Sequence, residues 1–379
     1  MSAQTENIGL EILSDAAVSP NLAQGDQACA CVFTQAAVAS HGEVFLSYRR
    51  GPGKHGPEGA FVVQRSADRG ATWGEPVTVC APTEGKIPTS VLCGGIAASG
   101  NALLAAFTVV ELRRTDIYVF SEEARDFPLR TYVSRSEDGA ATWSAPREIA
   151  TGALHRPTAG GNVFAMEGGG ICIPIENMLR GGPQATAAVF TSDLGRTVSA
   201  PVVFAADPEE RTSFCDARFT RLSGGGFLMH LWTFVHEGEQ TLAIHQSRSP
   251  DGRSWSRPVP LAVHGQISAP LQLPSGLVIA VNNHRQFPEG SQLWWSRDGG
   301  GTWNRHPVQM WDPARSRVVG EPAAERVTSA RENVWDELQR FSFGSPGLVL
   351  LDDGTVLLSY FATVGGVLHA RACRFRVRG

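Results

Sequence analysis

Short runs of alternating or continuous apolar residues, separated by glycine-containing turns, follow one another along most of the chain. The first three runs are Ala28–Val38, Glu43–Tyr48 and Ala60–Arg65. A run of about four to eight residues with period-two alternation, bounded by turn residues, is typical of a half-buried β-strand. The pattern therefore predicts an all-β fold made of many short strands and tight turns.

The strand-like runs come in groups of three, and the group recurs along the chain. The later groups are Ser90–Ala97, Ala102–Val109 and Thr131–Arg135; Gly161–Met166, Gly170–Ile175 and Thr186–Phe190; Phe214–Leu222, Gly226–Phe234 and Thr241–Arg248; Ile267–Leu273, Leu277–Asn282 and Gln292–Trp295; and Gly347–Leu351, Thr355–Phe361 and Leu368–Val377. A supersecondary unit that repeats in this way packs against its neighbours in one continuous array. The sequence thus predicts six units in a single domain.

Nearly the same eight residues follow the third run of the first five groups. They read SADRGATW (Ser66–Trp73), SEDGAATW (Ser136–Trp143), TSDLGRTV (Thr191–Val198), SPDGRSW (Ser249–Trp255) and SRDGGGTW (Ser296–Trp303). The aspartate of such a motif can accept bonds from the backbone that follows, its glycine allows a positive φ, and its hydroxyls close the turn. We expect each motif to turn the third strand of its unit into a fourth, with the tryptophan covering the junction.

The last group has three strand-like runs and no such motif after them. Asn7–Leu13 is the one unassigned segment with strand character, so we expect it to pair with Leu368–Val377 and close a ring. Closure removes the exposed edges of an open array. The predicted fold is an all-β six-bladed propeller over residues 1–379, with blades at about 27–80, 88–150, 155–206, 211–262, 265–310 and 342–377 plus 7–13.

Two segments interrupt the repeat. Residues 111–130 form a long connection between the second and third strands of the second unit. Pro322–Phe341 carries apolar residues at helical spacing with charges between them, which predicts an amphipathic helical insertion. Such a helix could pack on the rim of the ring or act as a lid over a pocket, and the sequence leaves both interpretations open.

Composition narrows the class of partner. The chain has 33 basic and 37 acidic residues, a net charge of −4 and no run of lysine or arginine, which argues against nucleic acid and membrane partners. Seven scattered cysteines without a CxxC pair, and a start that resembles no signal peptide, favour a reduced cytoplasmic setting. No ligand-like spacing of histidine or cysteine and no phosphate-binding loop are visible, so we expect no metal and no cofactor.

The repeated motif resembles the Asp-box, or BNR repeat, and a six-bladed propeller that carries it resembles the sialidase (neuraminidase) superfamily. The resemblance runs from about Ala28 to Val377 and includes Gly160–Glu176 and Gly347–Tyr360. It implies a carbohydrate-active enzyme that cleaves a glycosidic linkage of an acidic sugar, of the sialic or uronic acid type.

The standard catalytic residues of that superfamily do not carry over. Its first-blade arginine belongs to a motif that aligns here with Gln27–Gln35, which contains neither arginine nor proline. Its tyrosine nucleophile aligns with Ser345, and the glutamate that accompanies the tyrosine aligns with Asp216. We therefore expect a mechanism other than the tyrosine-based one.

Propeller geometry predicts where a site would lie. The motifs turn on one face of the ring, so the opposite face collects the starts of the inner strands and the ends of the second strands around a central depression. The candidate catalytic residues there, which can exchange a proton, are His155, Glu176, Asp216 and His284. The candidate substrate-binding residues, which offer cations, amides or a stacking surface, are Arg50, Arg156, Asn177, Arg211, Arg218, Trp232, Asn283 and Arg285.

Each candidate also has a structural interpretation. His155 and Arg156 could lie in a solvated loop, and Asp216 with Arg218 could form a salt bridge that only supports the strand. Three functions stay open: a hydrolase, which needs two carboxyl groups or one with an activated nucleophile; a lyase, which needs a histidine or similar base and an arginine; and a propeller that only binds. The expected partner is a small acidic carbohydrate or oligosaccharide, and the oligomeric state is not predicted.

Overall fold

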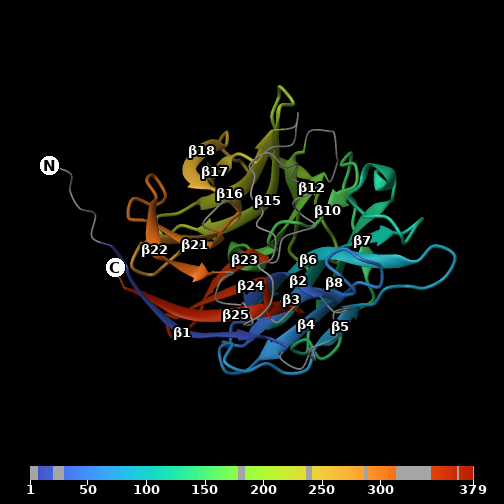
Figure 1. Cartoon of the computed structure of the whole chain (residues 1–379), viewed down its shortest axis with the longest axis horizontal. Helices are drawn as coiled ribbons and strands as arrows, with labels where there is room; N and C mark the ends of the chain where they lie inside the picture. The colour runs from blue at the N-terminus through green and yellow to red at the C-terminus, as the bar shows by residue number, and fades with distance from the viewer. Residues whose placement is uncertain are drawn as a thin grey trace, which may run out of the picture.

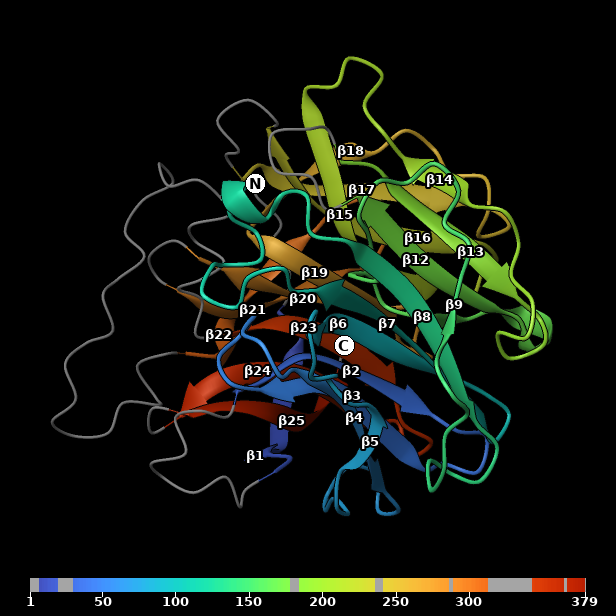
Figure 2. The same ribbon diagram turned by 90° about the vertical axis from the view of Figure 1, so that its right-hand side faces the viewer.

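The computed structural model describes residues 7–19, 30–177, 184–235, 241–285, 289–312, 343–364 and 367–378. Within these ranges the chain is all-β apart from two 3-10 turns, η1 (Glu122–Ala124) and η2 (Glu167–Gly169). The sheets stand side by side around a common centre (Figures 1 and 2). The predicted all-β, propeller-like fold is confirmed.

Four of the sheets are separate antiparallel units. They contain β6 (Thr89–Ser99), β7 (Ala102–Glu111), β8 (Leu129–Ser136) and β9 (Arg147–Glu148); β10 (Pro157–Thr158), β11 (Phe164–Ala165), β12 (Ile171–Asn177), β13 (Thr186–Thr191) and β14 (Val202–Ala205); β15 (Thr212–Arg221), β16 (Phe227–Val235), β17 (Ala243–Ser249) and β18 (Val259–His264); and β19 (Gln266–Gln272), β20 (Val278–His284), β21 (Gly290–Ser296) and β22 (Asn304–Trp311). Each corresponds to one unit of the sequence repeat.

A fifth, eight-stranded sheet holds the two ends of the chain. It contains β1 (Gly9–Ala17), β2 (Ala30–Val38), β3 (Val44–Gly51), β4 (Ala60–Ser66), β5 (Val77–Cys80), β23 (Phe343–Leu350), β24 (Val356–Val364) and β25 (Val367–Arg378). Its halves, β2–β5 and β23–β25 with β1, meet in one parallel pairing, Ala30 with Leu368. The described strands therefore form six antiparallel units.

The N-terminal strand pairs with the last strand, as predicted. β1 runs antiparallel to β25, with Leu10 opposite Val377, and the two lie side by side in Figure 1. The Tyr360 hydroxyl on β24 donates to the Asp15 carboxylate at 2.7 Å, and Arg371 Nη2 lies 3.1 Å from the same carboxylate. These contacts attach the N-terminal strand to two strands of the C-terminal unit.

The five repeated motifs form the expected turns between third and fourth strands. In the second motif, Ser136 Oγ donates to Asp138 Oδ1 at 2.8 Å, and Thr142 donates to the same carboxylate from its backbone at 2.9 Å and from its hydroxyl at 2.6 Å. The hydrogen bonds from Thr142 and Ser136 lower the pKa of Asp138 to about 2. The aspartates of the other four motifs, Asp68, Asp193, Asp251 and Asp298, have a pKa of about 2 as well.

The core lies between neighbouring sheets. Phe61 of the first unit stacks on Phe107 of the second, with ring centroids 5.2 Å apart, and Ile96 and Leu103 complete the same buried cluster. Burial of such side chains contributes roughly 25 cal/mol per Å² of apolar surface. Because each unit is buried by its neighbours, the array is stable only as a whole.

A bulge interrupts most of the innermost strands where they approach the centre. Strands β2, β15, β19 and β23 each shift register there, and the residues at the shifts have positive φ: Phe33 (59°), Asp216 (51°), Ile267 (49°) and Ser345 (49°). A bulge leaves its extra residue unpaired and re-aims the side chains beside it. All four residues line the central cavity described below.

The two interrupting segments have different outcomes. The connection at 111–130 contains η1, and its Val119, Phe120 and Phe127 pack in a buried cluster with Trp232 of β16. The helical insertion predicted at 322–341 lies outside the described residues. Across the described ranges, no helix has the length and apolar character needed to cross a membrane.

Candidate functional site

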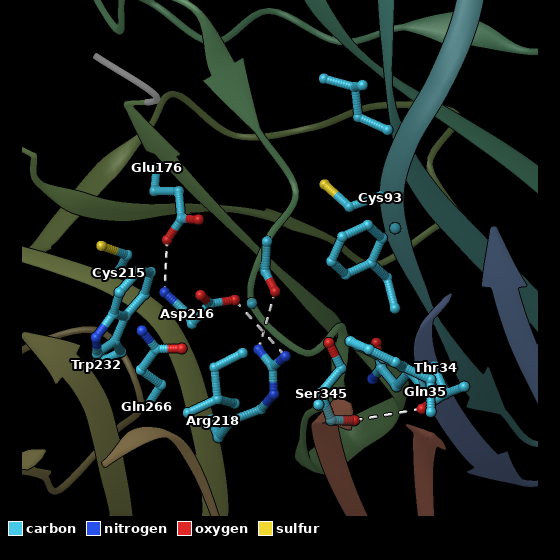
Figure 3. Close-up of a pocket in the computed structure, with 18 of the residues that line it drawn as sticks. Thr34, Gln35, Cys93, Glu176, Cys215, Asp216, Arg218, Trp232, Gln266 and Ser345 are labelled. Carbon is cyan, nitrogen blue, oxygen red and sulfur yellow. Dashed lines mark hydrogen bonds and ion pairs between the residues drawn. The ribbon is translucent and has the colours of Figure 1, made fainter. Parts of the chain in front are cut away.

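One cavity opens at the centre of the ring. It is lined by residues from all six units, and its volume is about 880 Å³ with the open space at its mouth included. The bulges bring Phe33, Asp216, Ile267 and Ser345 to its wall. Figure 3 shows Thr34, Gln35, Glu176, Asp216 and Arg218 gathered around it.

Two carboxyl groups meet in the wall of this cavity. Glu176 ends the apolar strand β12 and is 2% exposed, and its Oε2 accepts the backbone N–H of Asp216 at 2.6 Å (Figure 3). Burial, followed by repulsion from Asp216, raises the pKa of Glu176 well above its usual value. Burial also raises the pKa of Asp216 to about 6, against the opposing effect of Arg218. The shift favours the protonated form of Glu176, whereas Asp216 is ionised above a pH of about 6.

Arg218 supports this pair from two residues along β15. Its Nη2 lies 3.8 Å from Asp216 Oδ1, and its Nη1 donates to the backbone carbonyl of Gly160 at 2.9 Å. Arg218 is itself buried, 6% exposed, so its charge acts at low dielectric. A Cβ at position 160 would collide with Glu176 Oε1 and lie 3.5 Å from Asp216 Oδ1, so glycine is required there for the pair to fit.

Two further basic side chains line the cavity. Arg285, just after β20, donates from Nη1 to the Phe343 carbonyl at 2.5 Å, and its guanidinium lies 4.3 Å from the Phe343 ring. Lys54, from the loop between β3 and β4, is 9% exposed, with its Nζ 5.2 Å from the centre of the Phe361 ring. The guanidinium groups of Arg218 and Arg285 suit the cavity to a ligand with an anionic group.

A histidine lies beside Lys54. The His55 ring packs against Phe33 (5.1 Å), Phe120 (4.9 Å) and Tyr118 (5.5 Å). Burial, with added repulsion from Lys54 and Arg49, keeps the pKa of His55 well below 6.5. Its imidazole is therefore neutral at physiological pH and can accept a proton only at some energetic cost.

The structure brings five of the predicted site residues into the cavity. Glu176, Asp216, Arg218, Trp232 and Arg285 all line it. Asp216 and Arg218 also form the salt bridge that the sequence allowed as a purely structural interpretation of these two residues. This salt bridge lies within β15 and also lines the cavity. Two of the four predicted catalytic residues are thus brought together.

The remaining seven predicted residues are not among those that line this cavity, and their roles in a site stay predictions. His155, Arg50 and Arg211 are exposed, and Arg211 pairs with Glu209. Arg156 is buried elsewhere and donates to the Val119 carbonyl at 3.3 Å. Strand pairing holds the other three at the rim: Asn177 opposite Pro157, Asn283 opposite Ser291, and His284 opposite Gly290. The position of a residue at the end of a strand therefore does not by itself predict whether its side chain points into the cavity.

Several lining residues were missed. The most notable are Lys54 and His55, which come from a connecting loop, and the thiols Cys93 and Cys215. Burial raises the pKa of Cys93 to about 12 and that of Cys215 well above its usual value, so both thiols are protonated. Composition offered one usable signal, since Lys54 is one of only two lysines in the chain.

Comparison with known proteins agrees with the architecture. Residues 117–357 match the family model described as "BNR repeat-like domain". The chain belongs to this family. No curated protein matches the chain. The match covers most of the repeats, including the carboxyl pair and Arg218.

Several solved structures have the same fold as this chain. A protein of unknown function from Dyadobacter fermentans has a TM-score of 0.73 at 20% identity, over 98% of this chain and 100% of that one. The Trypanosoma rangeli sialidase in complex with the inhibitor DANA has a TM-score of 0.62 at 13% identity, over 91% of this chain and 55% of that one. An α-L-arabinanase of Penicillium chrysogenum complexed with arabinobiose has a TM-score of 0.60 at 13% identity, over 96% and 98%. This chain thus spans about half the length of the sialidase.

Proposed function

We propose that this BNR-family protein is a glycosidase that cleaves a glycosidic linkage of an acidic sugar, of the sialic or uronic acid type. The fold supports a glycosidase, because the sialidase and the arabinanase with the same fold carry sugar-derived ligands. The single observation that carries the proposal is the buried carboxyl pair, Glu176 and Asp216, beside Arg218 in the central cavity.

The carboxyl pair supplies the two groups that hydrolysis of a glycoside needs. Because its pKa is raised well above the usual value, the protonated form of Glu176 is favoured, and this proton can pass to the departing oxygen. Asp216, ionised above a pH of about 6, can stabilise the positive charge that develops on the sugar or direct a water molecule to it. Arg218 keeps Asp216 ionised while Glu176 stays protonated.

In this mechanism the nucleophile is Asp216 or a water molecule, in place of a tyrosine. Ser345 stands at the position that aligns with that tyrosine, and its backbone carbonyl accepts a hydrogen bond from Thr34 at 3.3 Å. Among the described residues, the cavity wall contains no tyrosine. A serine hydroxyl without a neighbouring base is a weak nucleophile.

Arg285 supplies the preference for an acidic sugar. It lines the same cavity as the carboxyl pair and lies outside the Asp216–Arg218 ion pair. An arginine that is held through backbone contacts, as Arg285 is by the Phe343 carbonyl, is well suited to a carboxylate. A neutral sugar offers Arg285 no carboxylate, so it should bind more weakly than an acidic one.

A lyase is the second candidate, and it depends on His55. The two histidines first considered for this role, His155 and His284, do not line the cavity, whereas His55 does and is neutral. A lyase would use His55 to remove the proton next to a carboxylate held by Arg285. Its product carries a new carbon–carbon double bond conjugated with the carboxylate, which absorbs in the short-wavelength ultraviolet.

One assay separates these functions. The protein is incubated with sialosides and with uronic-acid oligosaccharides, while new reducing ends and ultraviolet absorbance are both recorded. The proposal predicts reducing ends without absorbance, and their loss in Glu176→Gln. Absorbance that is lost in His55→Ala would replace it with the lyase. The proposal is overturned if neither reducing ends nor absorbance appears while the protein binds the sugar and Arg285→Ala abolishes that binding. The protein would then bind the sugar without cleaving it.

A further inference from the structure

Lysine is almost absent from this protein, which makes its placement informative. Of the 33 basic residues only Lys54 and Lys86 are lysines. Lys86 is exposed, whereas Lys54 is 9% exposed and lines the central cavity. Lysine is rarely buried in proteins, because its charge is costly to remove from water. The buried amine of Lys54 is therefore a candidate for chemistry that a guanidinium does not provide.

The loop that carries Lys54 is held in place by a buried arginine. Arg49, 0% exposed, donates from Nε to the Val91 carbonyl at 2.7 Å, from Nη1 to the Gly53 carbonyl at 2.8 Å and from Nη2 to the Gly56 carbonyl at 2.6 Å. Gly59 makes room for this guanidinium, because a Cβ there would lie 2.6 Å from Arg49 Nε. The backbone on both sides of Lys54 is therefore fixed, and the amine is directed into the cavity.

The surroundings of Lys54 favour its neutral form. Its Nζ faces the ring of Phe361, and Phe33 lines the same part of the wall. Burial, with added repulsion from Arg285, lowers the pKa of Lys54 well below 10.5. An amine that is desolvated beside another cation is the known condition for a nucleophilic lysine that attacks carbonyl groups.

We propose that Lys54 is a nucleophilic amine that forms an imine with the carbonyl group of an anionic ligand, such as the open-chain form of a 2-oxo sugar acid. The lone pair of the neutral amine attacks the carbonyl carbon, and the new carbon–nitrogen bond becomes double as the carbonyl oxygen leaves. Both protons of the amine depart with that oxygen as water, so no oxidant or reductant is needed. Arg285 binds the carboxylate of the same ligand and brings its carbonyl to Lys54.

Reductive trapping tests this without any turnover. The full-length protein is mixed with pyruvate, the simplest ketone of this class, and sodium cyanoborohydride, and the adduct on each lysine is quantified by peptide mass spectrometry. Each unit by which a lysine pKa falls gives about tenfold more neutral amine near pH 7. We expect at least about tenfold more adduct on Lys54 than on Lys86 in the same molecule. Acetone, which lacks the carboxylate, should label Lys54 far less than pyruvate does.

Lys86 serves as the internal control, so the result does not depend on a variant that folds. Equal labelling of the two lysines, or none on Lys54, would overturn the imine. Lys54→Arg should lose the adduct, whereas Lys86→Arg should keep it. Excess N-acetylneuraminate, itself a 2-oxo sugar acid, should compete with pyruvate for Lys54. The choice of a sugar acid as ligand rests on the proposed function, whereas the trapping experiment with pyruvate does not. If Lys54 is trapped but no glycosidase activity is detected, the proposed function fails and the imine stands.

Discussion

The backbone N–H of Asp216 donates to Glu176 Oε2 at 2.6 Å, which ties two acidic residues from different blades into one unit. The bond exists because Asp216 stands at a bulge with positive φ, where its N–H is released from pairing with β16. The same bulge directs the Asp216 side chain toward the cavity. Local backbone geometry in β15 therefore positions two groups against Glu176 of β12. The Asp216 carboxylate adds to burial in raising the pKa of Glu176, whereas the Asp216 N–H lowers it.

Replacing Glu176 by glutamine removes the proton donor while keeping the shape of the side chain. We expect kcat on an acidic glycoside to fall by about 10² to 10⁴. Glu167→Gln is the matched control, because Glu167 is exposed and pairs only with Arg221 at 2.6 Å. Steady-state kinetics with thermal melts would check this; equal rates for the two variants would contradict a role for Glu176 as acid.

The pH dependence of activity should reflect the coupled carboxyl pair. Asp216 must be ionised and Glu176 protonated, so kcat/KM should rise through a pH of about 6 and fall again where Glu176 loses its proton. The rising limb should disappear in Asp216→Asn, together with most of the rate. A profile without any inflection between pH 5 and 7, measured with the wild-type protein, would contradict the assignment of Asp216.

Stability should respond to pH in two opposite ways. The pKa of Asp216 is raised to about 6 from 3.8, so its contribution is present below pH 4 and is lost as pH rises through 6. The motif aspartates, with a pKa of about 2, contribute above pH 4 and lose that contribution as pH falls through 2. Urea titrations at several pH values should show that Asp216→Asn flattens the first change and leaves the acid limb intact.

Gly160→Ala tests the space around the pair. The added Cβ would collide with Glu176 Oε1 and shift the carboxyl group, and a displacement of about 1 Å can cost about 100-fold in rate. Gly224→Ala is the control, because nothing lies within 4 Å of its added Cβ. We expect kcat to fall in the first variant only, with similar melting temperatures for both; unchanged kcat in Gly160→Ala would show that the pair tolerates displacement.

Tyr360→Phe tests the attachment of the N-terminal strand. The hydroxyl donates to Asp15 at 2.7 Å and accepts from Arg371 Nε at 3.0 Å, and the phenol is 0% exposed. Its removal leaves a half-buried carboxylate with one partner fewer, so the free energy of unfolding should fall by about 1 to 3 kcal/mol. Denaturant unfolding would measure this, and protease cleavage near β1 should become faster. An unchanged midpoint would mean that strand pairing alone holds β1.

Much of the fold could be predicted because its signals are local. Each motif turn is stabilised by hydrogen bonds within a few residues, as for Asp138 with Thr142, so the sequence window contains the whole cause. The N-terminal strand was predicted by elimination, since the last unit lacked a fourth strand, and β1 does pair with β25. The cytoplasmic location and the exact blade bounds stay predictions.

The site was predicted only in part, because the directions of its side chains depend on tertiary contacts. Glu176 and Asp216 were found from their place at strand ends, but the same reasoning also named His155 and His284, which do not line the cavity. A register shift in β15 places Asp216 in the cavity wall, and the pattern of a single sequence does not reveal such a bulge. Lys54 was missed because hydrogen bonds from Arg49 to three carbonyls, two of them in its own loop, are what turn it toward the centre.

The bulged inner strands have a consequence for how this architecture can change. At Phe33, Asp216, Ile267 and Ser345 the backbone leaves the regular ladder, and pairing resumes beyond it. Because these four residues line the cavity and are absent from the strand pairing, we expect substitutions at them to change the cavity wall more than the sheets. These positions are therefore the ones at which we expect ligand preference to change at the smallest cost to the fold.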